Sequence, residues 1–175
     1  MGTDAAGRPG GGDHGQLSTP VIDHLDALGI DHLVRRHTRP ALTAELAAAE
    51  RGVRVSQIAK CMVAADPEGQ LYVLLLPGDR RLKLRKARRG LGGVALRLVD
   101  REELGDRYGL IVGAISPVQL LSHGAVMVCD PTLLDEQWVD ISSGDPLAGV
   151  ELRSRDLVAL LGATLLDIVS DRTDA

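Results

Sequence analysis

The chain has 175 residues, of which 45% are hydrophobic, with a net charge of −4 and a mean hydropathy of +0.05. These values are typical of a single globular domain, and no apolar run approaches the roughly 20 residues that span a bilayer. The lack of Phe, with only two Tyr and one Trp, argues against a nucleic-acid sheet that stacks bases on aromatic rings. We expect no membrane or DNA partner and, because the first residues lack a secretory pattern, a cytoplasmic location.

The amino-terminal part is predicted to be a tail followed by a helix, a strand and a second helix. Residues 1–16 hold six Gly and are typical of a disordered tail, so the folded domain is expected over 17–172. Thr19 can cap the first helix with Pro20 in its first turn, and Gly29 and Gly52 can end the two helices. The expected elements are a helix over 20–28, a strand over 32–37 and a helix over 43–51.

A hairpin is expected next, because apolar strands over 58–65 and 70–77 are separated by the turn sequence DPEG. A basic helix over 80–89 follows it. Since strands and helices interleave without a regular βαβ period, we predict one α/β (α+β) domain around a mixed, curved sheet. The remaining expected elements are strands over 93–100, 110–116, 125–130, 137–142, 149–153 and 164–169, helices over 101–107 and 155–162 (the latter capped by Ser154), and a helical turn over 131–135.

Lys60 is the first candidate site residue, because it stands inside the apolar strand IAKCMVAA with no neighbouring acid. Lysine is among the residues least often buried unless it is paired. An ammonium group at such a position is worth its desolvation cost if it faces a pocket, where it could hold a phosphate or polarise a carbonyl. The alternative is that Lys60 is only an unusual residue of this strand and has no functional role.

The segment YGLIVGAISPVQL over 108–120 is the second candidate, since Gly109, Gly113, Ser116 and Pro117 interrupt an apolar run. Glycines there allow a ligand to approach the backbone closely, or they mark a bulge in an ordinary strand. No P-loop, GxGxxG, HExxH or GxSxG motif is present, and the His and Cys residues lack metal-ligand spacing. We expect no cofactor and no metal.

The segment RRLKLRKARR over 80–89 concentrates seven basic residues in an otherwise acidic chain. Such a segment could meet phosphates while the rest of the chain repels polyanions, or it could be a solvated helix face. The residues that would contact phosphates are Arg80, Arg81, Lys83, Arg85 and Lys86.

These segments together resemble the YbaK/prolyl-tRNA editing domain family. The family pattern begins with a strand that has a central lysine and continues as a hairpin; the strand here is IAKCMVAA. A pGD-x-x-L-x-L-x-K stretch follows, which is PGDRRLKLRK here. The pattern ends with G-x-x-x-G-x-x-S/P-P, which is found here in YGLIVGAISP. TAELAAAERGV upstream and CDPTLLDEQWVDISSG downstream are similar to two further family elements. The resemblance covers roughly 20–170 and implies a mixed α/β fold, with a barrel-like sheet, that hydrolyses mischarged aminoacyl-tRNA, often tRNA bearing the wrong amino acid for proline.

The resemblance also implies roles for single residues. Lys60 matches the central functional lysine of the family. The loop that lines the aminoacyl pocket matches Gly113, Ser116 and Pro117, and its mouth matches Thr43 and Glu45. The expected catalytic residues are Lys60, Gly113 and Ser116, and the expected substrate-binding residues are Thr43, Glu45, Gly109 and Pro117. The expected tRNA-binding residues are Arg80, Arg81, Lys83, Arg85 and Lys86.

Two positions depart from the family pattern. Family members often have GLDIEL where this chain has AGVEL, so Gly149 stands at a position that is often acidic. Family members also often have a glycine after SPL, where this chain has Gln119. The reading favoured is a trans-editing deacylase acting on aminoacyl-tRNA, with an aminoacyl-tRNA synthetase as a further candidate partner. The alternatives are a noncatalytic member that binds tRNA or a synthetase, and a small-molecule binder with the same fold.

Overall fold

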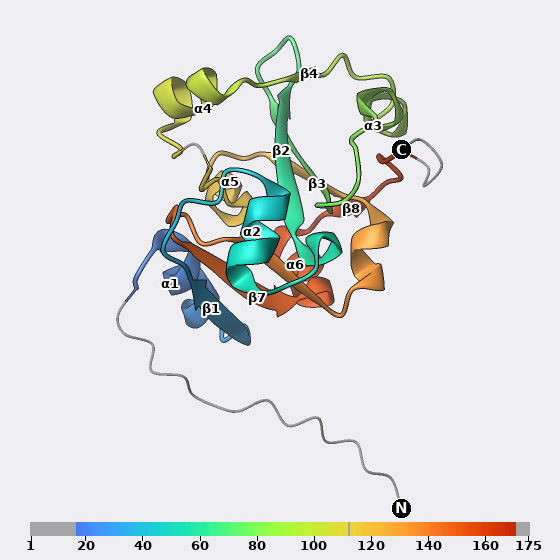
Figure 1. Ribbon diagram of the computed structural model, residues 1–175. Coiled ribbons are helices and arrows are strands. Elements are labelled where there is room, and N and C mark those ends of the chain that lie inside the picture. Colours follow the sequence, from blue (N-terminus) through green and yellow to red (C-terminus); the bar gives the residue numbers. More distant parts are fainter. Residues whose placement is uncertain (1–16, 112, 171–175) are drawn as a thin grey trace, which may run out of the picture.

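The computed structural model describes residues 17–111 and 113–170 (Figure 1). The tail predicted for 1–16 lies outside the described residues. Among those described there are six α-helices, none of them long and apolar enough to cross a bilayer. The helices are α1 (Pro20–Ala27), α2 (Ala44–Arg51), α3 (Leu84–Gly90), α4 (Arg101–Tyr108), α5 (Pro117–Leu121) and α6 (Ser154–Leu161), with 3-10 turns η1 (Val55–Gln57) and η2 (Pro131–Asp135).

The described strands form two sheets. The smaller is antiparallel, in the order β1-β7-β6, and the larger is mixed, in the order β4-β2-β3-β5-β8. The strands are β1 (His32–Arg36), β2 (Ala59–Ala65), β3 (Leu71–Pro77), β4 (Arg97–Leu98), β5 (Val126–Cys129), β6 (Trp138–Ser142), β7 (Ala148–Arg153) and β8 (Thr164–Leu165). The mixed α/β prediction is therefore confirmed, whereas neither sheet closes on itself and the barrel-like shape is not confirmed.

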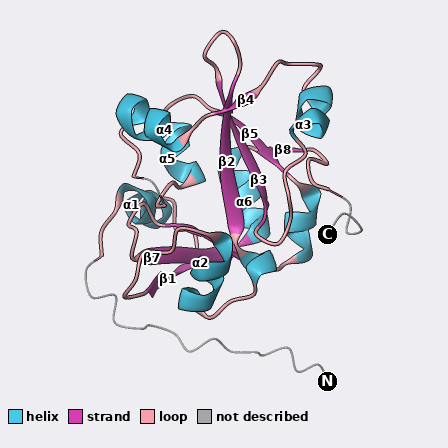
Figure 2. Cartoon of the chain, turned by 45° about the horizontal axis from the view of Figure 1, so that its top comes forward, coloured by secondary structure: helices cyan, strands magenta, loops and turns pink. Residues whose placement is uncertain are grey.

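The β2–β3 hairpin is the centre of the larger sheet, as the sequence predicts. Its strands pair in register from Ala59 opposite Pro77 to Ala65 opposite Leu71. Every residue of β3 is buried, because β3 lies between β2 and the parallel strand β5. In Figures 1 and 2, α3 and α4 lie on opposite sides of one end of β2.

Successive residues of β2 pack into two different cores, because side chains alternate across a strand. Val63 and Ala65 belong to the larger core, between the sheets and helices α1 and α6. Ala64 belongs to a second core under α3. A bridge between Ile58 and Asp140 connects the start of β2 to β6, so the two sheets meet at this point.

Several predicted elements differ from the structure. The strand expected over 110–116 is wrong: these residues are a loop as far as they are described, and Pro117 starts a helix that the sequence analysis missed. Gly113 has φ +85°, which is outside the extended region, and proline suits the first turn of a helix. The strands expected over 93–100 and 164–169 shrink to two residues each. Ser154 is the first residue of α6 rather than its cap.

Candidate active site

A cavity of about 570 Å³ lies where α2, β2, β6 and the segment before α4 meet. The residues at its mouth are exposed, among them Leu42, Thr43 and Glu45. Its inner wall contains the buried pair Arg51 and Asp140. The cavity thus combines an open rim with a charged interior.

Lys60 lines this cavity from β2, which agrees with its predicted orientation toward a pocket. Its Nζ donates hydrogen bonds to the carbonyl oxygens of Gly78, at 3.3 Å, and Arg80, at 2.6 Å. Burial lowers the pKa of Lys60 below its ordinary 10.5, whereas Glu45 and Asp79 act to raise it. An ammonium group has three N–H donors, so these two hydrogen bonds leave one donor for a ligand.

Thr43 and Glu45 lie at the mouth, at the start of α2. The Thr43 hydroxyl accepts the backbone N–H of Leu46 at 3.2 Å and so caps the helix. Hydrogen bonds from its own backbone N–H and from Thr43 lower the pKa of Glu45, with a smaller effect from Lys60. Glu45 is therefore ionised at neutral pH.

The loop residues predicted for the site separate into two groups. Gly113 lines the cavity, and a Cβ at this position would lie 2.5 Å from a methyl carbon of Leu42. Gly109, which ends α4 with φ +64°, is not among the lining residues. Neither are two buried residues at the start of α5, Ser116 and Pro117. The backbone N–H of Ser116, the N-cap residue of α5, donates to Gln119 Oε1 at 3.0 Å.

Gly78 is a lining residue that the sequence analysis missed. A Cβ on Gly78 would lie 2.5 Å from the carbonyl oxygen of Val55 and 2.9 Å from the Cβ of Ala44. The chain can therefore pass between α2 and η1 only with glycine here. The PGD sequence after the hairpin was the available signal, but it does not reveal which elements crowd the position.

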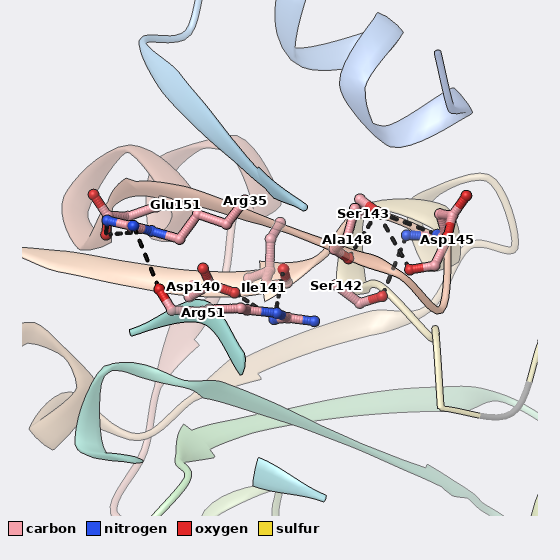
Figure 3. Close-up of polar contacts among 10 residues, drawn as sticks. Arg35, Arg51, Asp140, Ile141, Ser142, Ser143, Asp145, Ala148 and Glu151 are labelled. Atoms are coloured by element: carbon pink, nitrogen blue, oxygen red, sulfur yellow. Dashed lines mark hydrogen bonds and ion pairs between the residues drawn. The ribbon is translucent and has the colours of Figure 1, made fainter. Parts of the chain in front are cut away.

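Arg51 and Asp140 form a buried ion pair that the sequence analysis also missed (Figure 3). Arg51 is 8% exposed and Asp140 is fully buried. Burial raises the pKa of Asp140, and the Arg51 guanidinium opposes this shift. Asp140 interrupts the apolar run WVDIS as Lys60 interrupts IAKCMVAA, so the same reasoning could have found it.

The basic segment begins at the site and continues away from it along α3. Arg80 is half-buried and supplies the carbonyl that Lys60 binds. Lys86 pairs with Asp167 at 2.9 Å and is therefore partly neutralised. Residues on this segment with exposed side chains are Arg81, Lys83, Arg85, Arg88 and Arg89.

The two cysteines lack the features of a nucleophile. Burial raises the pKa of Cys61 to about 12, and the pKa of Cys129 to about 12. Because the thiolate is the reactive form, neither thiol is activated at neutral pH.

A family model for the aminoacyl-tRNA editing domain matches residues 38–160. The chain belongs to this family, which the sequence resemblance had indicated. The match spans α2, both strands of the hairpin, the basic segment and β6, so it includes every part of the cavity.

Individual relatives agree with this assignment. The chain is 26% identical over 149 residues to the proline–tRNA ligase of Corynebacterium glutamicum; the match covers 82% of the chain but spans only 22% of the ligase. A solved structure described as a proposed trans-editing enzyme for prolyl-tRNA synthetase has 29% identity and a TM-score of 0.72, with 89% of this chain and 100% of that chain covered. The crystal structure of the hypothetical protein APE2540 has 31% identity and a TM-score of 0.78, over 86% of this chain and 99% of that chain.

Proposed function

We propose that this protein hydrolyses the ester bond of mischarged aminoacyl-tRNA in trans, on tRNA(Pro) or a similar tRNA. Its membership of the editing family supports this proposal, as does its similarity, over 89% of this chain, to a structure described as a proposed trans-editing enzyme. The match to proline–tRNA ligases points to the same tRNA class.

The observation that carries the proposal is the position of Lys60. Its ammonium is fixed by two backbone carbonyls inside a cavity large enough for an aminoacyl group and part of the terminal ribose. A cation held in place there can bind the terminal phosphate or stabilise the oxyanion that develops on the ester carbonyl. A fixed donor needs little reorganisation during the reaction, which is where its catalytic value arises.

Water, or a group of the substrate itself, is the proposed attacking group. The cysteine thiols are not activated, and Ser116 is buried outside the cavity lining. Glu45 would hold the substrate's α-ammonium group at the mouth, and the backbone near Gly113 would face the oxyanion. Positioning and electrostatics would then supply the catalysis without a covalent intermediate.

The basic segment would bind the tRNA backbone. Because it starts at the carbonyl that Lys60 binds, phosphates near the acceptor end could contact exposed arginines while the ester enters the cavity. Such contacts are independent of sequence and add affinity for any tRNA.

The decisive experiment incubates the protein with tRNA(Pro) charged with different amino acids and follows release of each amino acid. We expect enzyme-dependent hydrolysis of at least one mischarged species, reduced about ten- to hundredfold or more in Lys60→Met by loss of a charge-assisted contact. Arg36→Met, which removes an exposed charge on β1, is the matched control and should keep the wild-type rate. Binding of tRNA without hydrolysis of any species would instead identify a noncatalytic member.

A further inference from the structure

One edge of β2 has no partner strand where it borders the cavity. The strand β3 pairs with β2 along its whole length, whereas β4 pairs only with Ala64 and Ala65, at one end of β2 (Figure 2). The backbone N–H of Val99 extends this pairing by one bond, to the carbonyl oxygen of Val63 at 2.9 Å. The chain then turns into α4, and residues on both sides of the resulting gap line the cavity.

This open part of β2 is short, because it is closed at both ends. A bridge joins Ile58 to Asp140 of β6, so the open part lies between that bridge and Val63. The edge of a strand presents N–H and C=O groups with which another group can pair. A gap that is closed at both ends admits a small ligand here, but not a strand of another protein.

Cys61 is the residue whose backbone groups face this gap. Both groups of one residue point to the same edge of an antiparallel strand, and those of the next residue point to the opposite edge. Since the carbonyl oxygen of Val63 faces β4, the N–H and C=O of Cys61 also point away from β3. In the described part of the chain, no strand or loop pairs with Cys61 on that side. Its side chain packs against the larger core, yet the residue is only partly buried and lines the cavity.

We propose that the main chain of Cys61 binds the main-chain atoms of the aminoacyl group. In a hydrogen-bonded antiparallel pair, the N–H and C=O of one residue meet the C=O and N–H of the residue opposite. An aminoacyl ester carries an ammonium group and a carbonyl oxygen on either side of its Cα, so it can take the place of that opposite residue. Its ammonium group would donate to the carbonyl oxygen of Cys61, and its ester carbonyl would accept from the N–H of Cys61. This inference rests on the proposed function, because it takes the cavity to be the aminoacyl site.

This pairing gives the N–H of Cys61 a role in the reaction. When water adds to the ester carbon, the carbonyl electron pair moves to the oxygen that this N–H binds. The pair returns as the ribose oxygen leaves with a proton from the attacking water. The N–H of Cys61 and the backbone near Gly113 would thus be two donors to the oxyanion. The ammonium group has three N–H donors, so a bond to Cys61 leaves others for Glu45.

The test replaces the N–H of residue 61 by an oxygen atom. Cys61→Ala is compared with a chain that has lactic acid, the hydroxy analogue of alanine, at position 61, introduced by suppression of a nonsense codon. We expect kcat on a mischarged tRNA(Pro) to be about a hundredfold lower with the ester, since loss of one oxyanion donor has an effect of this order. Equal rates would overturn the inference, while hydrolysis by the wild-type protein would stand.

Val34 offers a matched control. Among the described strands β1 pairs with β7 alone, and the N–H of His37 donates to the carbonyl oxygen of Leu147 at 2.9 Å. By alternation, the N–H of Val34 therefore points away from β7. The hydroxy analogue of valine at this position also removes an N–H from a strand edge and weakens a carbonyl within a ladder, but outside the cavity, so the rate should stay at the wild-type value. Equal losses at positions 34 and 61 would overturn the inference.

A binding measurement separates this inference from the proposed function. The probe is adenosine that carries alanine through a stable 3′-amide, added to the isotope-labelled full chain. We expect the amide proton NMR signal of Cys61 to shift downfield and its exchange with solvent to slow, whereas the signal of Met62, whose N–H faces β3, should change little. If no ester is hydrolysed, the proposed function fails, yet this change at Cys61 would still support the inference. An unchanged Cys61 signal would overturn it on its own.

Discussion

The Nζ of Lys60 lies 2.6 Å from the carbonyl oxygen of Arg80, so the lysine at the candidate active site also fixes the start of the basic segment. One ammonium group thus connects the cavity to the surface proposed to bind tRNA. Lys60 has a structural role beside any catalytic one, and variants at this position will change both.

Lys60→Met is expected to destabilise the protein, contrary to what burial of a charge alone suggests. The substitution removes the desolvation cost of the ammonium group, but it leaves the carbonyls of Gly78 and Arg80 without the donor that Lys60 supplies. A buried acceptor without a partner costs about 1–3 kcal/mol, so we expect a net loss on the order of 1 kcal/mol in the free energy of unfolding. Denaturant unfolding measures it, and a Lys60→Met protein more stable than wild type would contradict the structural role.

The titration of Lys60 offers a test that needs no substrate. Burial lowers the pKa of Lys60 in the folded chain below the 10.5 of the unfolded chain. Between these two pKa values the unfolded chain binds more protons than the folded chain, so the contribution of Lys60 to stability rises with pH. Below the folded pKa, the charged form of Lys60 destabilises the folded chain by its full amount. NMR titration of the lysine Cε signals, assigned with Lys60→Met, should show Lys60 deprotonating below 10.5.

The same titration has an internal control in Glu45. Its charge raises the pKa of Lys60, so Glu45→Gln should lower that pKa further. If Lys60 titrated at or above 10.5, or if Glu45→Gln raised the value, the proposed electrostatic environment of the cavity would be wrong.

Charge reversal on α3 should weaken tRNA binding without preference for any one tRNA. Each phosphate contact adds about −0.7 to −0.9 to the slope of log affinity against log salt. Arg85→Glu/Arg89→Glu should therefore lower affinity and flatten the slope, because both side chains are exposed. Arg36→Glu/Arg155→Glu makes the same charge change at exposed sites on β1 and α6, and unchanged binding is expected. Equal effects of the two double variants would point to net charge rather than to a binding surface.

Gly149→Ala is expected to destabilise the chain through Arg51. The new Cβ would meet the guanidinium at 2.5 Å and displace it from Asp140. Disruption of a buried ion pair can cost about 3–5 kcal/mol, which thermal or denaturant unfolding would detect. Gly105→Ala in α4, where a Cβ has ordinary contacts, is the control and should be neutral or stabilising. In an Arg51→Ala background, the cost of Gly149→Ala should largely disappear.

Neither cysteine should react in the folded protein. With both pKa values at about 12, the thiolate fraction near pH 8 is very small, so alkylation by iodoacetamide should be much slower than in denaturant. Cys61→Ala and Cys129→Ala should retain hydrolysis at a packing cost on the order of 1 kcal/mol. A folded Cys61→Ala protein without activity would bring thiol catalysis back into consideration.

The sequence by itself determined the features that depend on local chemistry. The DPEG turn, which starts at Asp66, defined the hairpin, and Thr43 and Gly52 defined the ends of α2. These predictions succeeded because caps and turns involve residues close together in the chain. The order of several such elements was also enough to indicate the family.

The tertiary structure decided what depends on contacts between distant segments. Asp140 is 89 positions from Arg51, and only the meeting of α2 with β6 pairs them. Gly149 looked like a missing acid until the structure placed a guanidinium over it. The loop around Gly113 was mistaken for a strand, because hydrophobicity does not reveal a left-handed backbone or a partner strand. Burial, pairing and backbone conformation at these positions are properties of the packed chain, and no short stretch of sequence contains them.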